Sequence, residues 1–248
     1  MGLKYHIKTF GCQMNYSDSE RVSAVLENAG YAPSKKYRDA DCIIFNTCSI
    51  RQKAEDKVFG LMNLMEELKK KNPKLVVGVT GCMVRRTGTR LATKRDALIN
   101  RLEEIDFVFR IDEAAKIPDL IREIHPSAIT ALAAELEEGS VNNYFKINPR
   151  YTSRFQAFVP IMSGCDKFCA FCIVPYARGR ERSRSIEEIY EECKKLVENG
   201  CVEITLIGQN VNSFGLNARE DLPGFVRHIS GARTAGEKTP FTQLLEKI

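Results

Sequence analysis

Apolar segments with the composition of β-strands alternate with helical segments along most of this sequence. In the first half, the strand-like segments are residues 3–9, 41–47, 74–81 and 107–109. Strands that are separated by helices usually pair in parallel, and the helices then cover the faces of the sheet. The alternation therefore predicts an α/β fold whose amino-terminal domain is a parallel sheet covered by helices.

The helices of this first half are expected within definite limits. Ser17 followed by Glu20 is typical of a capping box, which predicts the start of a helix that Gly30 ends. Residues 52–71 have a helical pattern and are expected to form the next helix. Residues 89–124 are expected to be helical on both sides of the short fourth strand.

A segment without periodicity separates two series of strands and helices. Residues 126–150 are rich in turn residues, so we expect a linker between one domain at residues 1–125 and another at residues 151–248. A barrel of eight βα units takes ~250 residues, and the second domain has only about 95. We therefore expect the first part of a βα barrel, and an incomplete chain.

Within the second domain, two strands and two helices are expected, and the second helix starts at Pro240 with Phe241, Leu244, Leu245 and Ile248 on one face. Residues 155–162 and 202–208 are strand-like, and Ser185 with Glu188 predicts a capping box that opens a helix ending at Gly200. Residues 218–239 are expected to form an exposed insertion.

Composition limits the class of protein. No apolar run approaches the ~20 residues that a membrane-spanning helix needs, and the amino terminus is too polar for a signal peptide. We therefore expect a cytoplasmic protein without membrane contact. Nine cysteines, an odd number, are then better explained as metal ligands or reactive thiols than as disulfides.

Three cysteines lie within eight residues, at Cys165, Cys169 and Cys172. Three thiolates at this spacing can hold three corners of a 4Fe-4S cube and leave one iron open. An open iron can chelate the amino and carboxylate groups of S-adenosyl-L-methionine. Zinc would need a fourth ligand that this loop does not offer, but zinc and plain buried thiols remain alternatives.

Three further cysteines follow predicted strands although they are far apart in the sequence. Cys12, Cys48 and Cys82 each come just after the carboxyl end of a strand, the edge where α/β sheets bind ligands. They could hold a second cluster, or be unrelated core thiols. The remaining cysteines, Cys42, Cys193 and Cys201, are expected to be packing residues.

Four arginines fall within seven residues, with Glu181 among them. Such a run can bind phosphate or carboxylate, and it can equally be a solvated face or a network of internal ion pairs. A formal net charge of +5 permits nucleic acid binding without arguing for it. The arginines are Arg178, Arg180, Arg182 and Arg184.

Several motifs together resemble the methylthiotransferase family of radical S-adenosylmethionine enzymes, of the type that modifies N6-dimethylallyladenosine in tRNA. The runs SGCDKFCAFCIVPYARGRERSRS and GQNVNSFG resemble the radical domain of that family. The runs KTFGCQMN, FNTCSIR and TGCMVRR are similar to its first domain. The resemblance implies a flavodoxin-like amino-terminal domain followed by the first part of a radical S-adenosylmethionine barrel.

The resemblance also implies roles for individual residues. Cys165, Cys169 and Cys172 would hold the 4Fe-4S cluster that cleaves S-adenosyl-L-methionine to a radical, which takes hydrogen from C2 of the adenine. Phe171 would lie against this cofactor. A second 4Fe-4S cluster, through which sulfur is delivered, would be held by Cys12, Cys48 and Cys82. Gln209, Asn210 and Asn212 of the GQNVNSFG run are either polar contacts of the cofactor or ordinary loop hydrogen bonds.

The family's substrate is position 37 of tRNA, so the implied partners are the tRNA anticodon stem-loop and an electron donor such as flavodoxin. We expect a monomer. Because the rest of the barrel and the family's RNA-binding domain are missing from this sequence, we expect it to hold clusters without turnover. Threonylcarbamoyl-adenosine in tRNA or an aspartate of a ribosomal protein are alternative substrates. A non-catalytic, metal-stabilised RNA-binding module is a further alternative.

Overall fold

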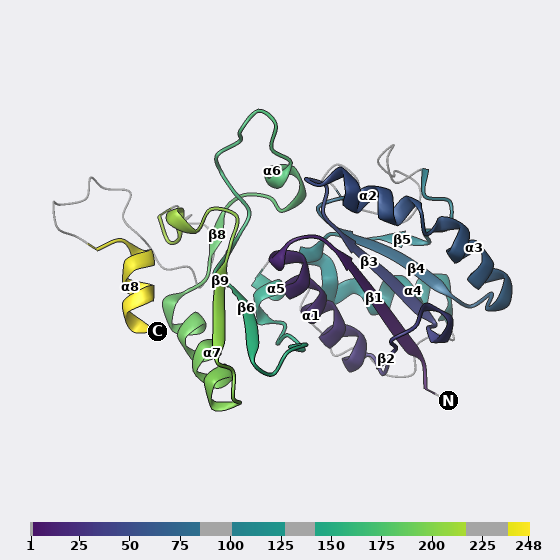
Figure 1. Cartoon of the computed structure of the whole chain (residues 1–248), viewed down its shortest axis with the longest axis horizontal. Coiled ribbons are helices and arrows are strands. Elements are labelled where there is room, and N and C mark those ends of the chain that lie inside the picture. The colour runs from purple at the N-terminus through teal and green to yellow at the C-terminus, as the bar shows by residue number, and fades with distance from the viewer. Residues whose placement is uncertain (1, 85–100, 127–141, 217–237) are drawn as a thin grey trace. The chain divides into compact units, whose positions relative to one another are not determined.

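The computed structural model describes residues 2–84, 101–126, 142–216 and 238–248 (Figure 1). These residues form two compact units. The first unit comprises residues 1–150 together with Tyr176–Arg178, and the second comprises residues 151–175 and 179–248. The domain limits at residues 125 and 150 stay predictions.

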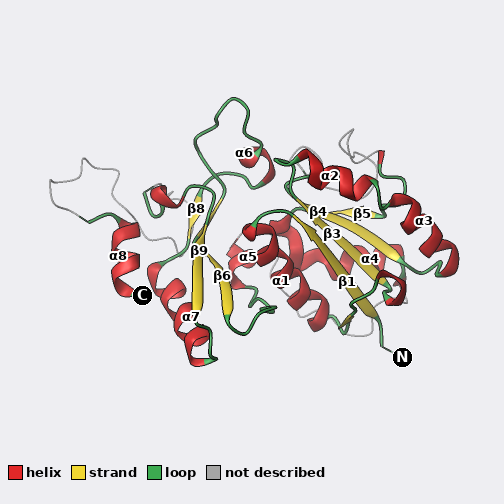
Figure 2. Ribbon diagram, in the orientation of Figure 1, coloured by secondary structure: helices red, strands yellow, loops and turns green. Residues whose placement is uncertain are grey.

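The first unit contains a sheet of five parallel strands (Figure 2). Along the sheet the order is β2-β1-β3-β4-β5, which is the order of flavodoxin-like folds. The predicted α/β class and the parallel amino-terminal sheet are therefore confirmed. The strands are β1 (Lys4–Phe10), β2 (Ala32–Pro33), β3 (Cys42–Thr47), β4 (Val76–Gly81) and β5 (Phe107–Val108).

Helices cover both faces of this sheet. The buried side of α1 (Gln13–Asn28) and of α4 (Ile117–Ile124) packs in the core cluster that contains Ile44. The helices α2 (Gln52–Phe59) and α3 (Met62–Lys71) pack in the other cluster, which contains Ile43. Successive residues of a strand point to opposite faces of the sheet. Since helices cover both faces, β3 and β4 are buried at every position and their sequences are mostly apolar.

The predicted start of the first helix in this unit is wrong. The first helix begins at Gln13, because Cys12 is its cap residue and the Asn15 side chain accepts a 3.3 Å hydrogen bond from the Cys12 backbone N–H. Ser17 lies inside the helix, where its hydroxyl accepts a hydrogen bond from Arg21. The end of this helix before Gly30 is confirmed.

The predicted helix over residues 52–71 is two helices, since α2 is capped at Gly60 and α3 starts at Met62. Glycine has a low helix propensity and permits this interruption. The helix expected from residue 89 falls largely outside the described residues. In the predicted linker, the short helix α5 (Asn142–Lys146) places Tyr144 in the core of the first unit, with 2% of its surface exposed.

In the second unit, β6 (Gln156–Pro160) and β9 (Glu203–Ile207) form a parallel pair, as expected for the first part of a βα barrel. The predicted strand over residues 155–162 is divided, because Met162 and Ser163 leave β6 and form β7, which pairs antiparallel with β8 (Arg182–Ser183). The helix α6 (Val174–Ala177) lies in the segment between β7 and β8.

The helix α7 (Ile186–Glu198) packs on β6 and begins with the predicted capping box of Ser185 and Glu188. A last helix, α8 (Pro240–Lys247), packs its Leu244 in the same core. The insertion predicted at residues 218–239 lies almost entirely outside the described residues. Among the helices that the structure describes, none has the length and apolar character to cross a membrane.

Candidate metal centres

The strand register brings three distant cysteines to one edge of the first sheet. Thr47 pairs with Phe10 on one side and with Gly81 on the other. Cys48 and Cys82 directly follow two of these paired residues, and Cys12 follows the third after one residue. The trio therefore lies at the carboxyl ends of β1, β3 and β4, next to the point where the strand order reverses, which is the usual ligand site of this fold.

Gly81 allows the last two cysteines to approach each other. Its φ angle is +90°, and a Cβ atom there would lie 2.4 Å from the Thr47 carbonyl oxygen and 2.5 Å from the Asn46 amide oxygen. Any other residue would collide with backbone that cannot give way and would also adopt a strained conformation. The residue before Cys82 is therefore glycine for a structural reason.

The thiols of Cys48 and Cys82 are buried and interact with each other, whereas Cys12 is exposed. The hydrogen bond from Cys82 lowers the pKa of Cys48 to about 6. Hydrogen bonds from the Ile50 and Arg51 backbone lower it further, whereas burial raises it. The pKa of Cys82 is raised well above its ordinary value, first because its thiol donates a hydrogen bond to Cys48 and second because it is buried. The thiols of Cys48 and Cys82 therefore influence each other's pKa at this edge of the sheet.

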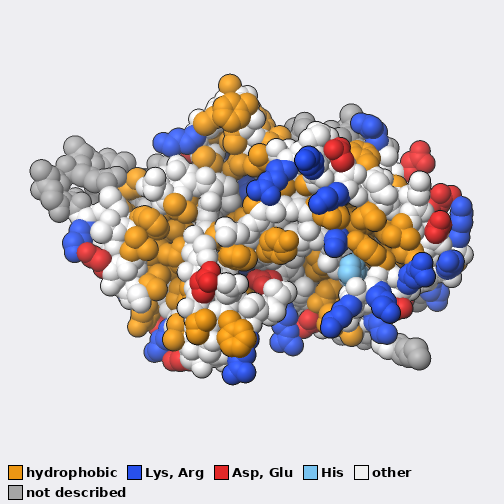
Figure 3. Space-filling model, viewed as in Figure 1, with side chains coloured by type: hydrophobic (Ala, Val, Ile, Leu, Met, Phe, Trp, Pro, Cys, Tyr) orange, Lys and Arg blue, Asp and Glu red, His pale blue; other side chains and the backbone are white. Residues whose placement is uncertain are grey.

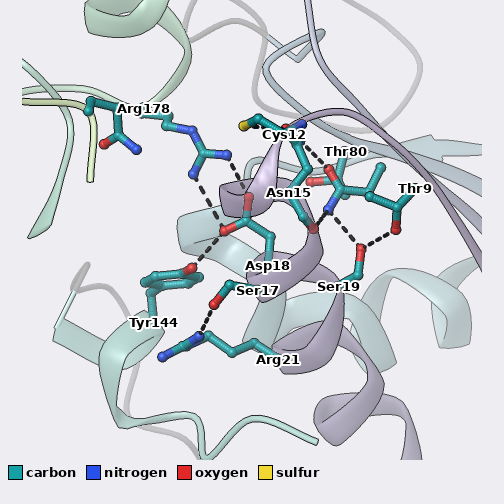
Figure 4. Close-up of polar contacts among 12 residues, drawn as sticks. Thr9, Cys12, Asn15, Ser17, Asp18, Ser19, Arg21, Thr80, Tyr144 and Arg178 are labelled. Atoms are coloured by element: carbon teal, nitrogen blue, oxygen red, sulfur yellow. Dashed lines mark hydrogen bonds and ion pairs between the residues drawn. The ribbon is translucent and has the colours of Figure 1, made fainter. Parts of the chain in front are cut away.

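A network of buried amides supports this edge of the sheet (Figure 4). The Asn15 amide nitrogen donates to the Asn46 side-chain oxygen at 2.8 Å, and the Asn46 amide donates to the Asn15 carbonyl oxygen at 2.7 Å. Asn46 also donates to Ser19 at 2.9 Å. Because Asn15 binds the backbone of Cys12 and Asn46 directly precedes Thr47 and Cys48, the amide pair ties two of the cysteine segments together.

A buried ion pair lies in the same unit. Asp18 is fully buried, and its carboxylate accepts hydrogen bonds from the Arg178 guanidinium at 2.6 Å and from the Tyr144 hydroxyl at 2.6 Å. The Arg178 side chain is 3% exposed. Figure 4 shows Arg178 and Tyr144 reaching Asp18 from different segments of the chain.

The other arginines of the run have separate partners. Arg180 pairs with Asp166 at 3.0 Å, and Arg184 pairs with Glu192 at 2.5 Å. The alternative of internal ion pairs is confirmed for Arg178 and Arg184, whereas the pair of Arg180 is at the surface, because 45% of its side chain is exposed.

The second set of cysteines lies on a loop that β7 and β8 close at its base. Gly164 has a φ angle of +82°, and a Cβ atom there would lie 2.1 Å from the Arg180 carbonyl oxygen. The Cys165 backbone N–H donates to the Gly179 carbonyl at 3.2 Å. One Asp166 carboxylate oxygen accepts from the Glu181 backbone N–H at 3.0 Å. The base of the loop is thus held by backbone contacts on both sides.

The loop itself is open to solvent. Cys165 is buried, Cys172 is half-buried and Cys169 is exposed. Phe171 has 95% of its surface exposed, so it is available to a ligand. Among the described residues, Phe168 alone has a positive φ without being glycine, at 46°. Such a conformation is uncommon and is often found at functional sites.

The polar residues predicted beyond β9 have contacts within their own loops. The Gln209 side-chain oxygen accepts a 2.5 Å hydrogen bond from the Gly164 backbone N–H. Gln209 therefore anchors the residue before Cys165. The Asn210 carbonyl oxygen accepts from the Ser213 backbone at 2.9 Å. These bonds agree with the alternative of ordinary loop hydrogen bonding and leave cofactor contact a prediction.

The donor sets fit iron-sulfur clusters better than a single ion. In the part of the chain that the structure describes, no three His, Cys, Asp or Glu side chains gather as ligands of one metal ion. Structural zinc would require such a gathering, usually with four ligands. A cube binds each thiolate to a different iron, so its ligands need not converge on one point. Two sets of thiolates without a fourth ligand match that requirement.

Sequence reasoning missed several residues of the first site. Asn15 and Asn46 lie in the runs that resemble the family, so a signal was present. Asp18 and Tyr144 had none, because a lone acid in a helix and a tyrosine in an expected linker are unremarkable. Cys42, Cys193 and Cys201 lie in apolar core clusters, which confirms their predicted packing role.

Two family models match this chain. Residues 4–101 match the model described as "Uncharacterized protein family UPF0004", and residues 159–235 match the model of the radical SAM superfamily. The matched segments contain the first and the second set of cysteines, respectively.

Curated relatives are similar over most of the chain. A protein of Dictyoglomus thermophilum is 43% identical over 212 residues, which is 86% of this chain and 46% of the relative. One of Clostridium perfringens is 40% identical, covering 90% of this chain and 49% of the relative. One of Clostridium botulinum is 41% identical, covering 99% and 49%. All three carry the name tRNA-2-methylthio-N(6)-dimethylallyladenosine synthase.

Over most of its length, the chain is similar to the methylthiotransferase family of radical S-adenosylmethionine enzymes. It spans about half the length of the curated relatives that it matches. The predicted family resemblance is confirmed. The match to the radical SAM model and these relatives support the use of S-adenosylmethionine and 4Fe-4S iron-sulfur chemistry.

Proposed function

We propose that this chain acts in the methylthiolation of tRNA, at C2 of N6-dimethylallyladenosine in position 37. The observation that carries the proposal is the meeting of Cys12, Cys48 and Cys82 at one sheet edge, in a chain that also has the Cys165 loop. A radical enzyme that only cleaves S-adenosylmethionine needs one such set. A second set is explained by a reaction that must also deliver sulfur.

The two sets would hold one 4Fe-4S cluster each. When bound, the cluster on Cys165, Cys169 and Cys172 supplies the electron that cleaves S-adenosylmethionine, and the other provides the route for sulfur. The count of two clusters is part of this proposal.

The residues of the chain position the loop for that chemistry. The β7–β8 pair and the contacts of Asp166 hold the base of the loop, and Gln209 fixes Gly164. The exposed ring of Phe171 is free to lie against the adenine of the cofactor. We also propose that Asn210 lies near the adenine of the cofactor.

The tRNA anticodon stem-loop is the proposed partner. Figure 3 shows Lys and Arg side chains at many points of one face, with acidic and hydrophobic side chains between them. Such a distribution permits phosphate contacts without one continuous basic surface on that face. Flavodoxin as the electron donor, a monomeric state and a cytoplasmic location stay predictions.

The names of the relatives support the dimethylallyladenosine substrate over threonylcarbamoyl-adenosine or a ribosomal aspartate. They also support an enzyme over a non-catalytic RNA-binding module. The two alternative substrates and the non-catalytic module are therefore treated as possible outcomes of the test of tRNA modification.

The test is mass spectrometry of tRNA nucleosides from a strain that lacks the gene. Loss of the methylthio group from the prenylated adenosine, restored by the gene but not by its Cys165→Ala or Cys48→Ala form, is expected. Loss from threonylcarbamoyl-adenosine instead would overturn the proposed substrate. Unchanged tRNA would overturn the proposed function.

A second test addresses the cofactor directly. The electron paramagnetic resonance spectrum of the anaerobically reconstituted, reduced chain should change when S-adenosylmethionine is added, because the ligand reaches an open iron. Cys169→Ala should abolish the response, and Cys201→Ala, a substitution of a core thiol, should leave it intact. A response that survives Cys169→Ala contradicts the assignment of the loop.

A further inference from the structure

Part of the first sheet is open to solvent and carries a lysine. Alternate residues of β1 point to opposite faces, since Tyr5 and Ile7 pack in the core cluster of α1 whereas Phe10 packs against the cluster of α2. Lys8 is two residues before Phe10 and therefore lies on the α2 face, where it is exposed. Beyond Tyr5, no strand of the described residues pairs with the outer side of β1. This open side leaves Lys8 exposed and Phe10 half-buried.

The Phe10 ring brings this lysine together with a second one. The Lys8 ammonium nitrogen lies 5.7 Å from the centroid of the ring, and that of Lys57 on α2 lies 5.6 Å from the same centroid. Both distances are in the range of cation–π contacts. Lys53 precedes Lys57 by one helical turn, so these two exposed residues share one face of α2. We call the three lysines, Lys8, Lys53 and Lys57, the β1–α2 basic surface.

The described residues do not neutralise this surface. Glu55 of α2 accepts a hydrogen bond from Ser49 instead. Asp56 accepts one from Gln52 at 3.0 Å. None of the three lysines has an ion-pair partner within the described ranges, and Figure 3 shows Lys and Arg side chains over α2 and the adjoining part of β1. Neighbouring like charges repel each other, so an anion that bridges them is favoured.

The basic surface lies beside the first set of cysteines. Phe10 is followed by Gly11 and Cys12, and its carbonyl oxygen accepts a hydrogen bond from the Cys48 backbone N–H at 2.8 Å. The helix α2 begins at Gln52, shortly after Cys48. An anion on this surface would therefore lie next to the strand ends that carry Cys12 and Cys48.

We propose that the β1–α2 basic surface binds the phosphate backbone of a single-stranded RNA loop, that of the tRNA anticodon stem-loop. The inference rests on the proposed function, because that function supplies the RNA. Lysine binds phosphate as a compact point charge, and the Phe10 ring holds two of these charges in place. Phosphate contacts position a nucleic acid without reading its sequence. The surface would thus present the loop to the first cysteine site and leave the choice of base to other residues.

A nucleotide chain suits this surface better than an acidic protein does. It carries one negative charge per nucleotide, which matches a row of separate cations. The electron donor has to serve the cluster on Cys165, Cys169 and Cys172, whereas the tRNA has to reach the site of sulfur delivery at Cys12 and Cys48. Binding of the acidic donor at the basic surface is therefore an outcome of the test that would contradict the proposal.

The test measures binding of a fluorescent anticodon stem-loop RNA to the whole, anaerobically reconstituted chain. Fluorescence anisotropy gives the affinity at several salt concentrations. Lys8→Gln and Lys57→Gln are combined in one variant. Lys70→Gln with Lys71→Gln is the matched control, because it also removes two exposed positive charges from the first unit, at the end of α3.

We expect the Lys8 and Lys57 variant to bind the RNA about 25-fold more weakly at low salt, about fivefold for each contact. The slope of its logarithmic salt dependence should fall by about 1.4, since each contact with a single strand contributes about 0.7. The control should keep both the affinity and the slope. Phe10→Leu keeps the charges but removes the ring that holds them, and should weaken binding about threefold. Iron content should be the same in all variants.

The outcomes separate this inference from the proposed function. RNA affinity that is unchanged in the Lys8 and Lys57 variant, or equally reduced in the control, overturns the inference. So does a chain that binds no anticodon stem-loop RNA at all. Loss of affinity for flavodoxin with RNA affinity retained assigns the surface to the electron donor. In each case the proposed function is decided separately, by the nucleosides of the strain that lacks the gene.

Discussion

The two cysteine sites hold the same number of thiols but are assembled in different ways. In the first unit, Cys12, Cys48 and Cys82 are 36 and 34 residues apart and come from the ends of three strands. In the second unit, three cysteines lie within eight residues on one loop. The first site exists only when the sheet is formed, whereas the second is largely present in the local sequence.

The two sites also differ in how far their residues are exposed to solvent. Two thiols of the first site are buried, and the same unit holds the buried amides of Asn15 and Asn46 and the buried carboxylate of Asp18. The loop of the second site exposes Cys169 and Phe171. Under the proposed function, the first site delivers sulfur and is expected to be rigid, whereas the second must admit a cofactor; the difference in exposure agrees with that proposal.

The largest expected effect is loss of a whole cluster. Cys48→Ala and Cys165→Ala should each reduce the iron content from about eight to about four per chain, because each removes one ligand of a different cube. Iron and sulfide analysis after anaerobic reconstitution measures this, with Cys193→Ala as the control that keeps all of the iron. Equal loss of both clusters on either substitution would erase the distinction between the sites.

Substituting the glycine before Cys82 should be nearly as harmful to the first unit. Gly81→Ala adds strain at positive φ and a collision with Thr47, together about 3 kcal/mol of unfolding free energy. Gly200→Ala, also at φ +90° but with only an Arg154 side chain 3.5 Å away, should cost about 1 kcal/mol. Urea unfolding followed by circular dichroism compares them. Equal costs would mean that the close approach of the strands is unimportant.

The buried amide pair should matter more than an exposed amide. Asn46→Ala leaves Asn15 and Ser19 without their buried partner and should cost about 2 kcal/mol. It should also reduce the iron retained by the first site. Asn199→Ala removes an amide that bonds only the exposed end of α7, and it should change stability by less than about 0.5 kcal/mol. The same unfolding measurement, with iron analysis, tests both.

The smallest effect is expected at the base of the exposed loop. Asp166→Ala removes the acceptor of the Glu181 backbone N–H and the partner of Arg180, which should cost about 1 kcal/mol. Only the response of the second cluster to S-adenosylmethionine should change with it. Glu66→Ala breaks an exposed pair with Lys70 on α3 and should have no measurable effect. A larger loss of stability at Asp166 would show that the loop is more rigid than its exposure suggests.

Local patterns were sufficient for β1, β3, β4, β5 and β9 and for the cysteine loop. The segments Cys42–Thr47 and Val76–Gly81 are mostly apolar, because both of their faces are covered, and such segments are typical of buried parallel strands. The Cys165 loop is likewise recognisable because its ligands are neighbours in the chain. The predicted start of α1 at Ser17 was wrong. The helix starts after Cys12, because the Asn15 side chain accepts a hydrogen bond from the Cys12 backbone.

The contacts of Asp18 with Arg178 and Tyr144 could not be predicted from local sequence patterns. Asp18 and Arg178 are 160 residues apart, and Asp18 and Tyr144 are 126 apart. No periodicity links such distant positions, and any of the acids in the chain could have been the partner of Arg178. The tertiary structure makes the choice when the sheet and its helices exclude water, because a buried charge is costly unless an opposite charge lies within reach.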